Sequence, residues 1–231
     1  TIGADSRRQF ADEVEGAKDF NAALHDLVVR EIKAHKRIIF NGNNYAPEWA
    51  EEAEKRGLLN LKNAAEALPR FADKKNIELF ERNKVFTARE VVTRTDIMLE
   101  NYSKVLNIEA LTMIDMAKQD IYPAVESYIA SLCGALKEKK GTLPGVSFPA
   151  QERMIAKLAS DAERMLERAE MLDSLLVEAK AHETPAKLAL FFAEKVIPVM
   201  QELGAYADGM ELNTAASVWP FPTYGEILFS V

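Results

Sequence analysis

The chain has 231 residues, of which 48% are hydrophobic, and this is enough to build a sizeable core. Its 29 basic and 36 acidic residues leave a formal net charge of −7, and no basic block is interleaved with aromatic residues, so we expect no nucleic-acid partner. The longest uninterrupted apolar stretch, residues 188–193, is far shorter than the roughly 20 residues that cross a bilayer, so we expect no membrane partner.

The cysteine content and the first residues bear on the cellular setting of the chain. The single cysteine, Cys133, excludes an internal disulfide and is typical of a reducing compartment, so we expect a cytoplasmic location. The chain starts at Thr1 within an amphipathic pattern, and no secretion signal follows. These features predict a piece of a longer protein.

The first 35 residues predict a helical part made of two helices, at about residues 6–16 and 20–35. Gly16 weakens the junction between the two helices, and Asp19 occupies the N-cap position of the second one. We therefore treat residues 1–35 as one helical part.

Residues 36–86 predict a short strand, a turn and short connecting helices. The run at residues 38–40, Ile-Ile-Phe, is the only internal segment that resembles a strand, and the Asn-Gly pair after it is a turn signal. Pro47 stands at a first helical position and Gly57 just past a last turn, so the residues between them predict a short helix.

Three long helices are predicted after this segment. The first covers about residues 87–136 and starts with a capping box formed by Thr87 and Glu90. The second covers about residues 150–181, where apolar residues repeat in heptads, and the third covers about residues 185–210. Each helix therefore has an apolar stripe that can pack against the other two.

The loops between these helices are short, and short loops make neighbouring helices antiparallel. The expected fold class is therefore mainly all-α: a long antiparallel three-helix bundle over residues 87–213, with the N-terminal helical part and at most one short two-stranded β element. Pro123 and Pro198 each lie about 20 Å from the end of their helix and each removes a backbone hydrogen bond. We expect two kinks at one level of the bundle.

Few residues show the pattern of a catalytic or metal site. The three histidines, His25, His35 and His182, lack the spacing of a metal-binding pair, and no glycine-rich phosphate-binding motif occurs. Cys133 falls on an apolar helix face, where a buried and inert thiol is expected. We therefore expect no catalytic, cofactor-binding or metal-binding residue in this chain.

One acidic residue falls within the apolar stripe of the first long helix. Glu109 shares this stripe with Tyr102 and Val105, and a buried carboxylate is costly without a partner. We expect a structural ion pair with Arg89, with Arg94 or with a residue outside this chain, and a role in a site is the alternative. The same helix also has more apolar residues than one face of a bundle can cover, so we expect something else to pack on it.

The end of the chain, residues 214–231, predicts an extended apolar tail, because the residues before Pro220 and Pro222 are biased to extended geometry. Six side chains are candidates for docking this tail: Trp219, Phe221, Tyr224, Ile227, Leu228 and Phe229. We expect residues 227–229 to pair as a strand with residues 38–40. The alternative is an arm that crosses to a neighbouring subunit.

Several long blocks of the sequence occur in an order and with a spacing that are typical of one protein family. They are HKRIIFNGNNY, WAEEAEKRGLLNL, KNIELFERNKVFT, MLENYSKVLNIEALTMIDMAKQDIYPAV and WPFPTYGEILFSV. Together they resemble the C-terminal region of type III glutamine synthetase, and the resemblance extends over about residues 10–231.

The resemblance implies a parent enzyme that joins ammonia to glutamate with ATP and Mg or Mn, and that assembles as double hexameric rings. In this family the metal-binding, nucleotide-binding and substrate-binding residues lie upstream of the matching region, so no catalytic residue carries over. The chain is then a non-catalytic region that buttresses the catalytic domain of the same chain and joins subunits, with residues 1–35 as the end of the helical part of the catalytic domain. The alternative is a free-standing helical scaffold or ligand-sensing bundle without catalysis.

Overall fold

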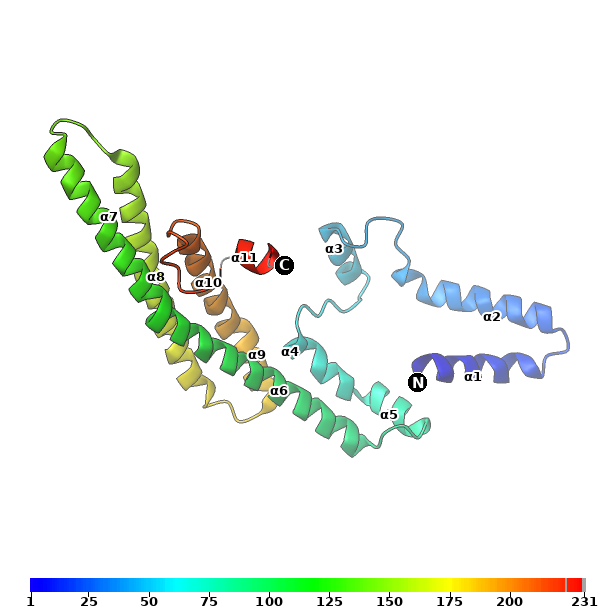
Figure 1. Cartoon of the computed structure of the whole chain (residues 1–231). Coiled ribbons are helices and arrows are strands. Elements are labelled where there is room, and N and C mark those ends of the chain that lie inside the picture. The colour runs from blue at the N-terminus through cyan, green and yellow to red at the C-terminus, as the bar shows by residue number, and fades with distance from the viewer. Residues whose placement is uncertain (223, 230–231) are drawn as a thin grey trace. The chain divides into compact units, whose positions relative to one another are not determined.

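The computed structural model describes residues 1–222 and 224–229 (Figure 1). All regular elements in this part of the chain are helical, and the described residues contain no strand, so the predicted mainly all-α fold is confirmed. The chain divides into two compact units, Thr1–Leu99 and Glu100–Val231, which we call the first and the second unit. Within the described residues, no helix combines the length and the apolar character that crossing a membrane requires.

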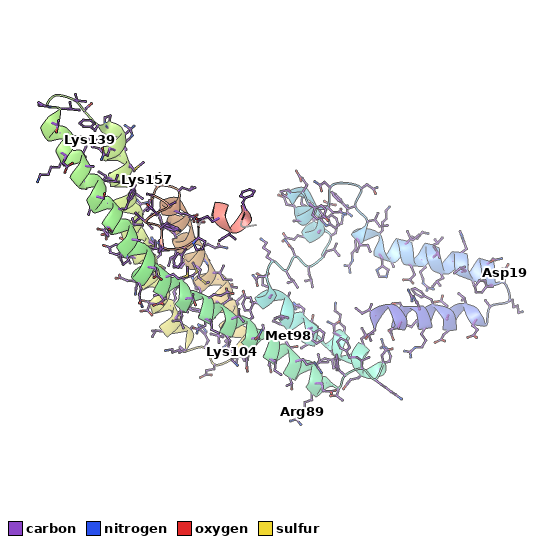
Figure 2. All side chains as sticks on the ribbon, viewed as in Figure 1. Asp19, Arg89, Met98, Lys104, Lys139 and Lys157 are labelled. Carbon is purple, nitrogen blue, oxygen red and sulfur yellow. The ribbon has the colours of Figure 1, made fainter. Side chains whose placement is uncertain are left out.

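The first unit consists of short and medium helices. They are α1 (Ile2–Glu15), α2 (Phe20–His35), the 3-10 helix η1 (Lys36–Ile38), α3 (Pro47–Lys55), α4 (Ala64–Ala67), the 3-10 helix η2 (Leu68–Ala72), α5 (Lys74–Arg82) and the start of α6 (Ala88–Asp115). Asp19, which Figure 2 labels at the start of α2, accepts a hydrogen bond from the backbone N–H of Ala22 at 3.1 Å. The predicted N-cap is therefore confirmed.

The strand predicted at residues 38–40 is wrong. Lys36–Ile38 forms the 3-10 helix η1, and residues 39 and 40 belong to no regular element. The guanidinium of Arg56 donates hydrogen bonds to the backbone carbonyls of Arg37 and Ile39, at 3.2 and 2.8 Å. A side chain from the end of α3 thus satisfies the carbonyls that a neighbouring strand would have bound, and local apolar character alone did not reveal this partner.

A buried carboxylate joins α1 to the end of α5 in the first unit. Asp5 on α1 is 5% exposed, and Arg82 at the end of α5 donates to both of its oxygens at 3.1 and 2.7 Å. Asn83, Arg8 and Gln9 donate further hydrogen bonds to it. The hydrogen bonds from Arg82 and Asn83 lower the pKa of Asp5 to about 2. The position of α1 therefore depends on one fully hydrogen-bonded carboxylate.

The second unit is the predicted bundle of long helices. It contains the rest of α6, the π-helix η3 (Met116–Ile121), α7 (Tyr122–Thr142), α8 (Pro149–Ala179), α9 (Pro185–Phe191), the π-helix η4 (Phe192–Val196), α10 (Ile197–Glu211) and α11 (Tyr224–Phe229). Figure 1 shows α7 and α8 as a long antiparallel hairpin with α10 beside it, and both α7 and α10 contact α8. The predicted antiparallel arrangement is therefore confirmed.

The core of the second unit follows the heptad pattern of α8. The buried side chains of α8 are Leu158, Ala162, Met165, Ala169, Leu172, Leu176 and Ala179. The heptad spacing places eight residues in two rows, Ile155, Ala162, Ala169 and Leu176 in one and Leu158, Met165, Leu172 and Ala179 in the other. Seven of these eight are buried, and Ile155 is partly exposed. The alanines alternate with larger side chains, and this allows neighbouring helices to approach closely.

Each of the two helix-interior prolines follows a π-helical segment. Pro123 is the second residue of α7, directly after η3, and Pro198 is the second residue of α10, directly after η4. A π-helical turn widens the helix where the proline ring and the missing N–H disturb the α-helical hydrogen bonds. Both π segments contact α8. A π-helical turn therefore precedes the proline in both helices, and the two kinks at one level stay a prediction.

Candidate functional site

The outer surface of α6 in the second unit carries exposed apolar side chains. Val105, Ile108 and Leu111 are 44%, 63% and 49% exposed, and we call these three residues the α6 face. On the other side of the same helix, Ala110 and Ile114 are buried in the core. Neighbouring exposed residues of this size on one helix are typical of a surface that meets another protein segment.

Glu109 lies beside the α6 face and is exposed, so the prediction of a buried carboxylate is wrong. The buried residue at this level of α6 is Ala110. Val105, which lies in the same predicted stripe, is also exposed, so this part of the stripe faces the surface of α6 and not the core. Arg94, one of the two predicted partners, lies over the ring of Phe86 at 4.6 Å.

The first half of the predicted tail folds back onto the second unit. Trp219 and Phe221 are partly buried and pack against its core. The backbone N–H of Trp219 also donates to the carbonyl of Ala215 at 3.1 Å. This part of the predicted tail is therefore a segment docked on the bundle and does not extend away from it.

The second half of the tail forms the short helix α11. Ile227, Leu228 and Phe229 are 60%, 73% and 79% exposed. Their pairing as a strand with residues 38–40 is wrong, because residues 227–229 are helical and none of the described residues forms a strand. The side chain of Tyr224, the sixth candidate for docking, lies outside the described part of the chain.

A groove in the second unit separates α6 from the end of α8 and the start of the next helix. Its volume is about 390 Å³, and its apolar walls include Leu176, Leu188 and Phe192. Lys104 and Glu100 lie at its rim, 3.3 Å apart, and Figure 2 labels Lys104 on α6. The groove has the size of a small-molecule site with mainly apolar walls.

The remaining candidates for chemistry each have their own local surroundings. His182 packs against the ring of Phe191 at 4.6 Å, and His35 lies 3.4 Å from the carboxylate of Glu31. Cys133 is exposed, so the prediction of a buried thiol is wrong. Within residues 1–222 and 224–229, no group of three or more His, Cys, Asp or Glu residues is placed to hold a metal ion.

The buried Asp5 is the main polar feature that the sequence did not reveal. Arg8 and Gln9 follow it at helical spacing, and this pattern is a weak signal of a local hydrogen-bonded cluster. The partner that matters most for its pKa, Arg82, lies 77 residues away along the chain. Only the three-dimensional structure brings the two residues together.

Comparison with known proteins identifies the family. Residues 23–140 match the family model described as the glutamine synthetase C-terminal domain. The chain belongs to this family. The resemblance inferred from the sequence blocks is therefore confirmed.

Three relatives align with most of the chain. A glutamine synthetase of Butyrivibrio fibrisolvens is 34% identical over 208 residues, which is 90% of this chain and 30% of the relative. A type-3 glutamine synthetase of Dictyostelium discoideum is 29% identical over 240 residues, which is 99% of this chain and 32% of the relative. A glutamine synthetase of Bacteroides fragilis is 26% identical over 90% of this chain. The chain spans less than a third of the length of each relative.

Proposed function

We propose that this chain is the helical C-terminal region of a glutamine synthetase whose full-length form ligates ammonia to glutamate with ATP and Mg or Mn. The observation that carries the proposal is the family match together with the alignment of 90–99% of the chain to proteins named glutamine synthetase. The nucleotide, metal and substrate sites are assigned to the part of the full-length protein that the chain does not cover. The chain itself contributes structure to the enzyme.

In this role the chain buttresses the catalytic domain of the same polypeptide and joins subunits. The exposed apolar side chains of the α6 face support the proposal, because burying them against another segment would be favourable. We propose that the full-length protein forms a homo-oligomer, and specifically a double hexameric ring.

The tail is proposed to dock through its six apolar candidates. Trp219 and Phe221 hold its first half on the second unit. Residues 227–229 expose their side chains and are proposed to reach a neighbouring subunit.

An assay of the full-length protein tests the proposal. Glutamate, ammonia, ATP and Mg²⁺ are supplied, and glutamine is measured by chromatography. Residues 1–231 alone are titrated with ATP and Mn²⁺ in a calorimeter. We expect glutamine from the full-length protein and no saturable heat from the chain alone. A full-length protein that forms no glutamine contradicts the proposed activity, and metal-dependent ATP binding by the chain alone contradicts the non-catalytic role.

The second candidate function is a free-standing ligand-sensing bundle, and the groove beside α6 favours it. The reading frame upstream of Thr1 separates the two functions. An upstream sequence that encodes Glu-bearing and His-bearing strands supports the synthetase. A stop codon and a start codon directly before Thr1 support the free-standing bundle.

A further inference from the structure

One side of α2 in the first unit exposes a regular row of apolar side chains. Phe20, Leu24, Val28 and Ile32 follow one another at steps of four residues, and they are 54%, 39%, 46% and 55% exposed. We call these four residues the α2 stripe. Side chains four residues apart on a helix form a continuous ridge, and such a ridge packs into the groove of another helix.

The α2 stripe borders a groove between α1 and α2. This groove has a volume of about 310 Å³ and is lined mainly by apolar side chains of both helices, including Phe10, Val14, Leu24 and Val28. It therefore offers a third helix two apolar walls that are already in place.

The pairing of α1 with α2 is well defined. Val14 of α1 and Leu27 of α2 are both buried. The guanidinium of Arg30 on α2 donates to the carboxylate of Glu13 on α1, with one of the two hydrogen bonds at 2.8 Å. These contacts hold the two walls of the groove at a fixed separation.

The range of the family match separates α1 from most of α2. The match begins at residue 23, so α1 (Ile2–Glu15) lies entirely before the matched residues. Yet α1 packs on α2, most of which lies inside the domain. A segment that precedes the matched residues therefore already packs on α2, beside the α2 stripe.

The relatives extend far beyond the matched region. The chain covers only 30% and 32% of two of them, and the family model describes a C-terminal domain, so most of their length precedes it. We propose that the groove between α1 and α2 receives an amphipathic helix from the preceding, catalytic part of the same polypeptide, which covers the α2 stripe. Covalent linkage gives this occupant a high effective concentration compared with a second copy. The inference rests on the proposed function and names the surface that joins the two parts.

Cysteine labelling tests the inference. Val28→Cys is introduced into the full-length protein and into residues 1–231, and Asp26→Cys, on the opposite side of α2 and also exposed, is the matched control. Labelling by a maleimide is followed by mass spectrometry of the peptide that contains the new cysteine. We expect residue 28 to react about tenfold or more slowly in the full-length protein than in residues 1–231, and residue 26 to react equally in both. Equal reactivity of residue 28 in both proteins overturns the inference.

A cross-linking experiment identifies the occupant. A photoreactive group is attached at residue 28 of the full-length protein, in a mixture of ¹⁴N-labelled and ¹⁵N-labelled copies. Cross-linked peptide pairs of a single isotope that map to the preceding region support the inference, and pairs of mixed isotope show a second copy and overturn it. Phe20→Cys, at the end of the α2 stripe, replaces Val28→Cys if the latter does not fold. Glutamine formation by the wild type is measured separately, and its absence refutes the proposed function. Residue 28 that reacts equally fast in an active full-length enzyme and in residues 1–231 refutes only this inference.

Discussion

At the scale of single residues, the best-defined interaction in the first unit is the carboxylate of Asp5 with the side chains of Arg82 and Asn83. The hydrogen bonds lower the pKa of Asp5 from 3.8 to about 2. A carboxyl group whose pKa is lower in the folded state stabilises that state at every pH above its unfolded pKa. This stabilisation is lost as the pH falls from about 4 towards 2.

The first prediction concerns this pH dependence. Asp5→Asn should lower the stability of the first unit at neutral pH, because a neutral amide cannot accept the paired hydrogen bonds of Arg82 in the same way. The loss of stability between pH 4 and 2 should become smaller in the variant than in the wild type. Urea unfolding at several pH values measures this, with the exposed Asp12→Asn on the same helix as the control. An unchanged pH dependence in Asp5→Asn would contradict the role of Asp5.

The two halves of the tail give a second prediction. Trp219→Ala should destabilise the second unit by about 2 kcal/mol, less than the 3–5 kcal/mol of a fully buried aromatic residue, because Trp219 is only partly buried. Leu228→Ala should change the stability of residues 1–231 by less than about 0.5 kcal/mol, because Leu228 is exposed. Thermal unfolding of both variants measures the difference. Equal effects of the two substitutions would show that the tail docks differently.

At the scale of elements, α8 organises the second unit because its buried heptad positions contact both neighbouring long helices. Leu172 is fully buried, so Leu172→Ala should cost about 2–5 kcal/mol through lost apolar contact and a residual cavity. Met171→Ala, at an adjacent and 45% exposed position, should cost much less. Chemical denaturation that follows helix content measures both values. A cost for Met171→Ala as large as that for Leu172→Ala would contradict this assignment of the core.

The long helices could be predicted because their signals are local. The capping box is present, since Glu90 accepts from the backbone N–H of Thr87 at 2.8 Å and Thr87 accepts from the backbone N–H of Glu90 at 3.3 Å. Thr184 caps α9 in the same local way. Heptad spacing and caps depend on residues within a few turns, and a sequence displays both directly.

The errors of prediction arose where a residue far away in the sequence fixes the local structure, or where the wrong side of a helix was taken as buried. Arg56 binds the carbonyls at residues 37 and 39, and no local pattern announces this contact. Cys133 and Glu109 were placed on the buried side of their helices but lie on the exposed side. The π-helical turns also shift the register along a helix, and a helical wheel with a constant period does not include that shift.

At the scale of the whole molecule, the family match and the exposed apolar surfaces support the proposed structural role within a glutamine synthetase. Hydrophobic side chains of the α6 face and of α11 are exposed within this chain, and they would be buried in an assembly. The relatives are more than three times as long as the region that they share with the chain. The proposed role therefore requires that parts of the full-length protein outside this chain cover these surfaces.

The solution mass of the full-length protein tests the proposed assembly role most directly. Light scattering is carried out on the wild type, on Ile108→Lys in the α6 face and on Glu167→Lys, which substitutes an exposed polar position of α8. Circular dichroism of residues 1–231 with each substitution checks that the chain still folds. The account predicts a homo-oligomer for the wild type and for Glu167→Lys, and a smaller species for Ile108→Lys, because a lysine charge would be buried in the contact. A monomeric wild type, or an Ile108→Lys variant with the mass of the wild type, would contradict it.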